Sequence, residues 1–203
     1  MKIGDLAELA DWRRQVADLY AEIRRMPEPP QAWEHWRDTR DTLFKCHPQS
    51  AIEEDARASF TGLNIYPYDP ALRFLVTLDP AAGAPLNLPA GNDGTVQAIP
   101  FARTNGLRDR LGGELMLYWL GGYGGGVFLP FTDATSGTET YGGGRYVLDT
   151  IKSADLGCAE DGRTILDFNF AYAPSCAHAP RYVCPLAPRE NRLPAPVRGG
   201  ERS

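Results

Sequence analysis

Residues 114–131 read ELMLYWLGGYGGGVFLPF. Two short runs of aromatic and aliphatic residues flank a glycine-rich centre at 121–126. Apolar runs of this length between turn residues are typical of β-strands. Glycine freely takes the positive φ angles that tight hairpin turns require. The stretch therefore predicts two antiparallel strands, 114–120 and 126–131, joined by a hairpin.

The same sequence pattern continues on both sides of this hairpin. Short runs rich in aromatic and β-branched residues, separated by turn residues, predict further strands at 72–78, 95–102, 145–150 and 163–170. Strands do not alternate with helices, as they would in a parallel Rossmann-type sheet. We therefore expect an antiparallel β body over residues 59–172.

The N-terminal part has helical periodicity instead. An apolar residue recurs every three or four positions between residues 5 and 26, and prolines then separate this helix from a second one at 31–46. The apolar positions of the first helix are Leu6, Leu9, Trp12, Val16, Leu19 and Ile23. The predicted fold class is α+β, with N-terminal helices (1–58) packed on an antiparallel β-sandwich or partly closed β-barrel.

The last part of the chain, 173–203, is rich in proline but too apolar to extend freely into solvent. We expect it to wrap around the β body, with Leu186, Pro188 and Leu193 docked on the sheet. The whole chain, 1–203, then forms one domain.

Composition excludes several classes of partner. The chain has 203 residues and a net charge of −5, and we find no concentrated cluster of basic residues, so a nucleic-acid partner is not expected. No apolar run approaches the length of a membrane span, and no apolar signal region follows Met1. We expect a cytoplasmic protein with no membrane partner. The sequence leaves the oligomeric state open.

Common catalytic motifs are absent. The sequence contains no G-x-x-x-x-G-K-[ST], no H-E-x-x-H and no G-x-S-x-G, and its three histidines give little material for a Ser–His–Asp site. No cofactor and no metal are therefore expected.

Polar residues nevertheless alternate along two predicted strands. Arg145 and Asp149 share one face of 145–150, and Asp167 and Asn169 share one face of 163–170. If these faces align, they form a polar cluster together with the loop that precedes 145–150. The candidate catalytic residues are Asp133, Tyr141 and Asp167, and the candidate ligand-binding residues are Thr135, Arg145 and Asn169. The alternative is a solvated sheet face with an ordinary salt bridge.

A second candidate feature is the segment from Cys176 through His178 to Cys184. Its C-x-H-x5-C spacing offers three zinc ligands but no recognisable fourth ligand. Packed thiols or a local crosslink are the alternative that we favour.

Several segments carry a family resemblance. The most specific are FTDATSG (131–137), ETYGGGRY (139–146), LDFN (166–169), CPLAP (184–188) and ENRLP (190–194). Over roughly residues 33–201 the chain resembles DUF1684, a bacterial and archaeal family of unknown function. The resemblance implies that all six candidate residues, together with Cys176, Cys184 and Asn191, occupy family-motif positions. It implies no reaction.

Three functions remain. The first is a small-molecule-binding domain, with or without enzymatic activity, that uses the polar cluster. The second is a structural or interaction protein, in which the same residues lock the hairpins and the tail together. The third is a Cys/His zinc-binding protein.

Overall fold

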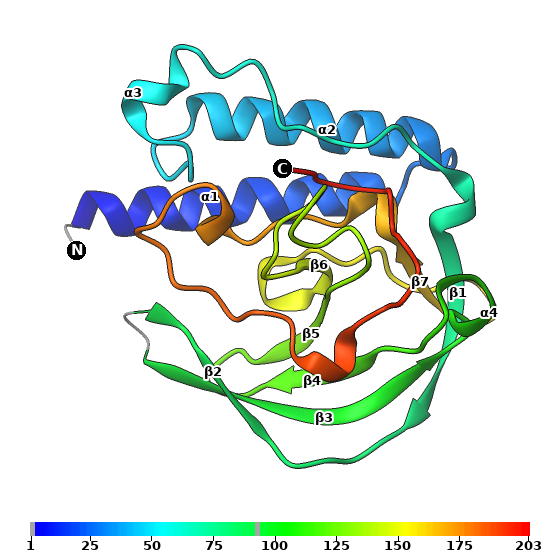
Figure 1. Ribbon diagram of the computed structural model, residues 1–203. Coiled ribbons are helices and arrows are strands. Elements are labelled where there is room, and N and C mark those ends of the chain that lie inside the picture. The colour runs from blue at the N-terminus through cyan, green and yellow to red at the C-terminus, as the bar shows by residue number, and fades with distance from the viewer. Residues whose placement is uncertain (1–2, 92–93) are drawn as a thin grey trace.

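The computed structural model describes residues 3–91 and 94–203. The fold is α+β, as the sequence predicts: N-terminal helices pack against an antiparallel sheet that is nearly closed into a barrel (Figure 1). The main helices are α1 (Ile3–Ile23) and α2 (Pro29–Cys46), followed by the short α3 (Glu54–Arg57). In the described part of the chain, no helix is both long and apolar enough to cross a membrane.

The sheet has the order β6-β5-β4-β3-β1-β7, and β2 pairs with β3 beside this path. Its strands are β1 (Arg73–Pro80), β2 (Leu86–Pro89), β3 (Thr95–Asn105), β4 (Met116–Leu120), β5 (Gly126–Phe131), β6 (Arg145–Asp149) and β7 (Thr164–Asp167).

Strand β1 allows the sheet to curl. Its first half, residues 73–76, pairs with β7, and its second half, residues 77–80, pairs with β3. Because β1 pairs with a different strand along each half of its length, the sheet bends. As a result β6 and β7, the two ends of the strand order, come into contact. This near closure creates the interior that the core residues fill.

The predicted hairpin is confirmed. Strand β4 pairs with β5 in antiparallel register, with Tyr118 opposite Phe128. The glycines fit the close contacts at the turn: a Cβ on Gly125 would lie 2.4 Å from the Leu120 carbonyl oxygen, and a Cβ on Gly126 would lie 2.4 Å from a Thr150 hydroxyl. A larger residue at either position would have to displace these groups.

Helices α1 and α2 lie side by side over one side of the barrel (Figure 1). The C-terminal part of α1 is buried, with Leu19 2% and Ile23 4% exposed, whereas Leu6 near its start is 48% exposed. On α2, Trp36 is fully buried and packs edge-on against Phe170 of the β body. The predicted apolar face of α1 therefore joins the core only in its second half.

The C-terminal tail crosses the β body (Figure 1). Leu193 and Val197 are fully buried in the main core, but Leu186, which we expected to dock, is 43% exposed. The Asn191 side chain accepts from the Met116 amide and donates to the Met116 and Pro130 carbonyls, each at 2.8 Å. These bonds hold the tail on strands β4 and β5.

Candidate functional site

Arg145, on β6, lies inside the protein with 1% of its surface exposed. Its Nη2 donates to the Val197 carbonyl at 2.7 Å and lies 3.3 Å from an Asp133 carboxylate oxygen. Its Nη1 donates to the carbonyls of Gly199 and Glu201. Burial lowers the pKa of Arg145, while Asp133 acts in the opposite direction. One carboxylate and the backbone of the tail thus bond both terminal nitrogens of the guanidinium group.

Asp133, in the loop before β6, also binds the tail. Its Oδ2 accepts a hydrogen bond from the Val197 amide at 2.6 Å. Its Oδ1 accepts from the hydroxyls of Thr135 at 2.7 Å and Ser136 at 3.1 Å. The Thr135 hydroxyl also lies 3.0 Å from that of Thr140. The loop before β6 is therefore folded around a carboxylate that binds the tail.

Asp167 and Asn169 form a second hydrogen-bonded cluster, separate from the Arg145–Asp133 pair. The predicted strand 163–170 ends at Asp167, because the Asp167 carboxylate caps a 3-10 turn, η4 (Phe168–Phe170), by accepting from the Asn169 amide at 3.0 Å. The Asn169 side chain bonds the backbone of Asp69 at 2.9 and 2.8 Å. Burial raises the pKa of Asp167, although Asn169 and Arg73 act in the opposite direction.

The two strands that we expected to align their polar faces are not paired. Strands β6 and β7 occupy opposite ends of the sheet order, and all five residues of β6 are buried. Neither face of β6 is exposed to solvent. The alternation of polar and apolar residues along this strand therefore does not separate a buried face from an exposed one. Arg145 forms its ion pair with Asp133, whereas the Asp167 carboxylate lies 3.5 Å from the Arg73 guanidinium group.

Tyr141 belongs to a third environment. Its hydroxyl lies 3.5 Å from the Cys176 sulfur. The hydrogen bond to Cys176, together with burial, raises the pKa of Tyr141 to about 12, so this hydroxyl stays protonated at neutral pH. Cys184 is within hydrogen-bonding reach of Cys176, and burial raises the pKa of its thiol. No group of three or more potential metal ligands occurs among the described residues.

Arg40 of α2 was not among the residues predicted from the sequence. Its guanidinium group hydrogen-bonds the Glu201 carboxylate of the tail, and both side chains are buried. The same group lies over three aromatic rings, 4.9 Å from the centre of Trp36, 5.1 Å from Phe44 and 5.2 Å from Tyr172. Cation–π contacts of this kind are strongest when the cation is removed from water.

Glu201 remains ionised in this setting. Burial raises its pKa, but Arg40 and then His178 more than offset this effect and hold the pKa down to about 2. The other Glu201 oxygen accepts a hydrogen bond from the Ala173 amide at 2.9 Å. The pair therefore joins α2, the tail and the segment after β7.

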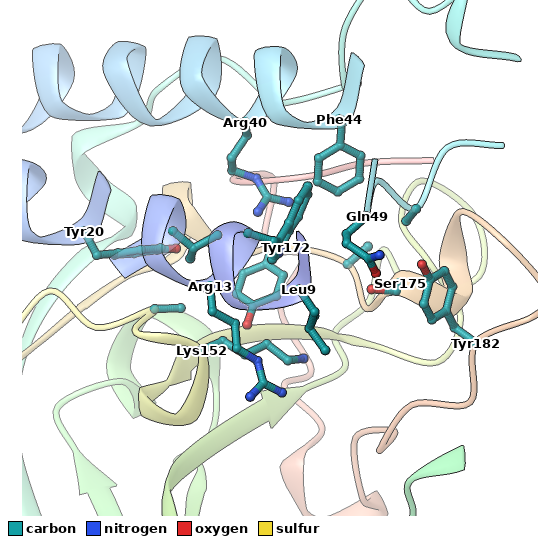
Figure 2. A pocket seen from close by; sticks show the side chains of 15 residues that line it. Leu9, Arg13, Tyr20, Arg40, Phe44, Gln49, Lys152, Tyr172, Ser175 and Tyr182 are labelled. Atoms are coloured by element: carbon teal, nitrogen blue, oxygen red, sulfur yellow. The ribbon is translucent and has the colours of Figure 1, made fainter. Parts of the chain in front are cut away.

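Beside Arg40 lies a cavity of about 200 Å³, which we call the helix–sheet cavity. Helices α1 and α2, with the segment between α2 and α3, form one part of its wall, and the segments after β6 and β7 form the rest. Figure 2 shows Arg40 and Phe44 reaching it from α2, with Arg13 and Lys152 on the opposite side. Its lining residues are Leu9, Trp12, Arg13, Val16, Tyr20, Arg40, Phe44, Gln49, Ala51, Lys152, Ala154, Tyr172, Ala173, Ser175 and Tyr182.

None of the six predicted site residues lines the helix–sheet cavity. Leu9, Trp12 and Val16 were predicted only as apolar positions of a helix, and such a pattern does not distinguish a core face from a cavity wall. Tyr172 and Lys152 stand alone in their segments, with no motif around them. Only the closure of the sheet against the helices brings these residues together.

Comparison with protein families decides the identity. A family model, described as protein of unknown function (DUF1684), matches residues 58–202. This chain belongs to the DUF1684 family. The DUF1684 match contains the Arg145 and Asp167 clusters, whereas α1, α2 and α3 precede it. Nine of the fifteen residues lining the helix–sheet cavity, Leu9 to Ala51, thus lie outside the matched region.

A solved structure is similar to most of this chain. The chain is similar to an uncharacterized protein of Haloarcula marismortui, solved by solution NMR, with 33% identity and a TM-score of 0.59. The similarity covers 88% of this chain and 98% of that one. A comparison with curated proteins found no match.

Proposed function

We propose that this DUF1684 protein binds a small, largely apolar molecule in the helix–sheet cavity. The observation that carries the proposal is the cavity itself, which has a volume of about 200 Å³ and a wall that includes Trp12, Phe44 and Tyr172. An apolar cavity of about 150 Å³ can hold benzene. A ligand of about ten non-hydrogen atoms therefore suits this space.

The lining has the composition of a binding site. Protein interiors are close-packed and leave few voids larger than a water molecule. Ligand sites combine apolar walls with a few polar groups that fix orientation. Gln49, Ser175 and Tyr182 supply an amide and two hydroxyls at the edge of the aromatic wall. We therefore assign the cavity to a ligand rather than to imperfect packing.

The same reasoning gives the six residues predicted from the sequence a role in the scaffold. Asp133 bonds Thr135, Arg145 and the tail backbone. Asp167 bonds Asn169, whose side chain also bonds the backbone of Asp69. A group whose hydrogen-bonding capacity is used within the chain has little left for a ligand. With Tyr141 protonated beside Cys176, we propose binding without catalysis.

The test is an NMR titration with 1-octanol, a neutral apolar molecule of suitable size. We expect saturable amide shifts confined to the cavity wall, including those of Leu9, Phe44 and Tyr172. In Leu9→Trp, which places a larger side chain at the wall, the shifts should disappear. Leu6→Trp is the matched control, because Leu6 lies on the same helix, is 48% exposed and does not line the cavity. It should retain binding.

The proposal fails if octanol produces no saturable shifts at the cavity wall. It also fails if Leu9→Trp and Leu6→Trp bind octanol equally well while both remain folded, since occupation of the cavity would then not matter.

A further inference from the structure

Charge is distributed unevenly around the helix–sheet cavity. Its lining includes Arg13, Arg40 and Lys152 but, among the described residues, no Asp or Glu. The whole chain has the opposite balance, with 26 acidic and 21 basic residues. A lining of cations only, in an acidic protein, favours a negatively charged ligand.

Two of the three cations are already compensated. Arg40 is paired with Glu201 inside the protein. The Lys152 ammonium group lies 3.5 Å from an Asp149 carboxylate oxygen and is half exposed. Within the described part of the chain, no carboxylate pairs with Arg13, which is exposed on α1. The cavity therefore presents about one uncompensated positive charge.

Arg13 and Lys152 stand together on one side of the cavity. They come from α1 and from the 3-10 turn after β6, η3 (Thr150–Lys152), and these two elements are in contact. Figure 2 shows both side chains opposite Arg40 and Phe44. A ligand can thus direct a charged head toward Arg13 while its apolar body contacts the aromatic rings.

We propose that the ligand of the helix–sheet cavity is an organic monocarboxylate with an apolar body of about eight carbons. This inference rests on the proposed function. A single negative charge matches the single unpaired cation, and a carboxylate accepts charge-assisted hydrogen bonds from a guanidinium group in a two-pronged geometry. A phosphate monoester would bring close to two negative charges. The second of these charges would lack a free partner.

The experiment compares octanoate, 1-octanol and octyl phosphate by titration calorimetry at neutral pH. We expect octanoate to bind roughly tenfold more tightly than octanol, because a hydrogen bond to a charged group contributes more than a neutral one. Arg13→Gln should bring octanoate down to the affinity of octanol and leave octanol unchanged. Arg14→Gln removes the same charge one position along the helix, outside the cavity, and should change neither affinity.

The outcomes separate this inference from the proposed function. Equal affinities for octanol and octanoate, with no effect of Arg13→Gln, would overturn the carboxylate assignment and leave apolar binding intact. If octyl phosphate binds more tightly than octanoate, with the same dependence on Arg13, the assignment of a singly charged ligand is overturned. If none of the three compounds binds, the proposed function falls and this inference falls with it.

Discussion

Arg40 and Glu201 form an ion pair in the interior, although they are 161 positions apart in the chain. Glu201 is 2% exposed, and Arg40 is 8% exposed and covered by aromatic rings. The pair fastens the tail to α2 beside the helix–sheet cavity. It therefore connects the stability of the fold with the shape of the cavity.

We predict that Glu201→Gln destabilises the protein by roughly 3–5 kcal/mol at neutral pH. The substitution leaves the Arg40 charge buried without its carboxylate, which is costlier than losing an exposed pair. Denaturant unfolding monitored by circular dichroism measures the change. Glu54→Gln, in an exposed part of the short helix α3, is the control and should cost less than about 0.5 kcal/mol. A loss below about 1 kcal/mol for Glu201→Gln would contradict the assignment.

The same pair predicts a pH dependence. The folded-state pKa of Glu201, about 2, lies below the ordinary value of 4.5. Ionised Glu201 therefore makes its full contribution to the free energy of unfolding above pH 4.5, and this contribution is lost as the pH falls toward 2. Between these limits the unfolding free energy of the parent should fall by roughly 3 kcal/mol more than that of Glu201→Gln. Parallel curves for the two proteins would exclude the ionised pair.

Arg145→Lys should lower stability without affecting binding. Lysine keeps the charge but cannot bond Val197, Gly199 and Asp133 together, and each buried group left unsatisfied costs about 1–3 kcal/mol. We expect a loss of roughly 3 kcal/mol in denaturant unfolding and unchanged octanol affinity well below the melting temperature. Arg163→Lys, in an exposed ion pair, serves as the control. Stable protein with abolished binding would instead place Arg145 in a ligand site.

Asn191→Ala tests whether the tail is integral to the fold. The substitution removes side-chain bonds to the partly buried Met116 amide and carbonyl and to the buried Pro130 carbonyl, and leaves these groups without this partner. We expect a loss of at least about 3 kcal/mol in thermal and denaturant unfolding. Asn87→Ala, on the exposed side of β2, should be nearly neutral. If both variants behave alike, the tail does not depend on this anchor.

Cys176 and Cys184 are predicted to bind no structural zinc. The two thiols are within hydrogen-bonding reach of each other, and Cys176 lies 3.5 Å from the Tyr141 hydroxyl. The intervening His178 lies 3.5 Å from the Glu201 carboxylate. Elemental analysis of protein purified without chelator should therefore find far less than one zinc per chain. Near-stoichiometric zinc that disappears in Cys184→Ser would reverse this assignment.

The elements of the fold were predictable because their signals are local. The 114–131 stretch gives a hairpin from its glycines and flanking apolar runs, and the helices follow from periodicity. Strand β2, with the sequence LNLP, gave no such signal, because it is short and ends in a proline. The tail was recognised as apolar, but Leu186 and Leu193 could not be told apart.

The helix–sheet cavity and the polar clusters were less predictable, because their residues come together only when the sheet closes. Arg145 and Asp167 have the same strand-like surroundings in the sequence, yet β6 and β7 are not paired: they end the strand order and contact each other only because the sheet curls. Arg40 sits among other charged residues of α2, and nothing near it indicates that its partner is Glu201. Local alternation identifies polar residues but does not identify which elements they face.

The most direct test of ligand binding is a crystal structure with 8-bromo-1-octanol. This ligand is neutral, so the test is independent of the head-group assignment, and the bromine can be located from its anomalous scattering. We predict one bromine peak inside the helix–sheet cavity, against Phe44 and Tyr172, that is absent in Leu9→Trp. If crystals soaked to saturation show an empty cavity, or bromine only at the outer surface, the proposed ligand binding is contradicted.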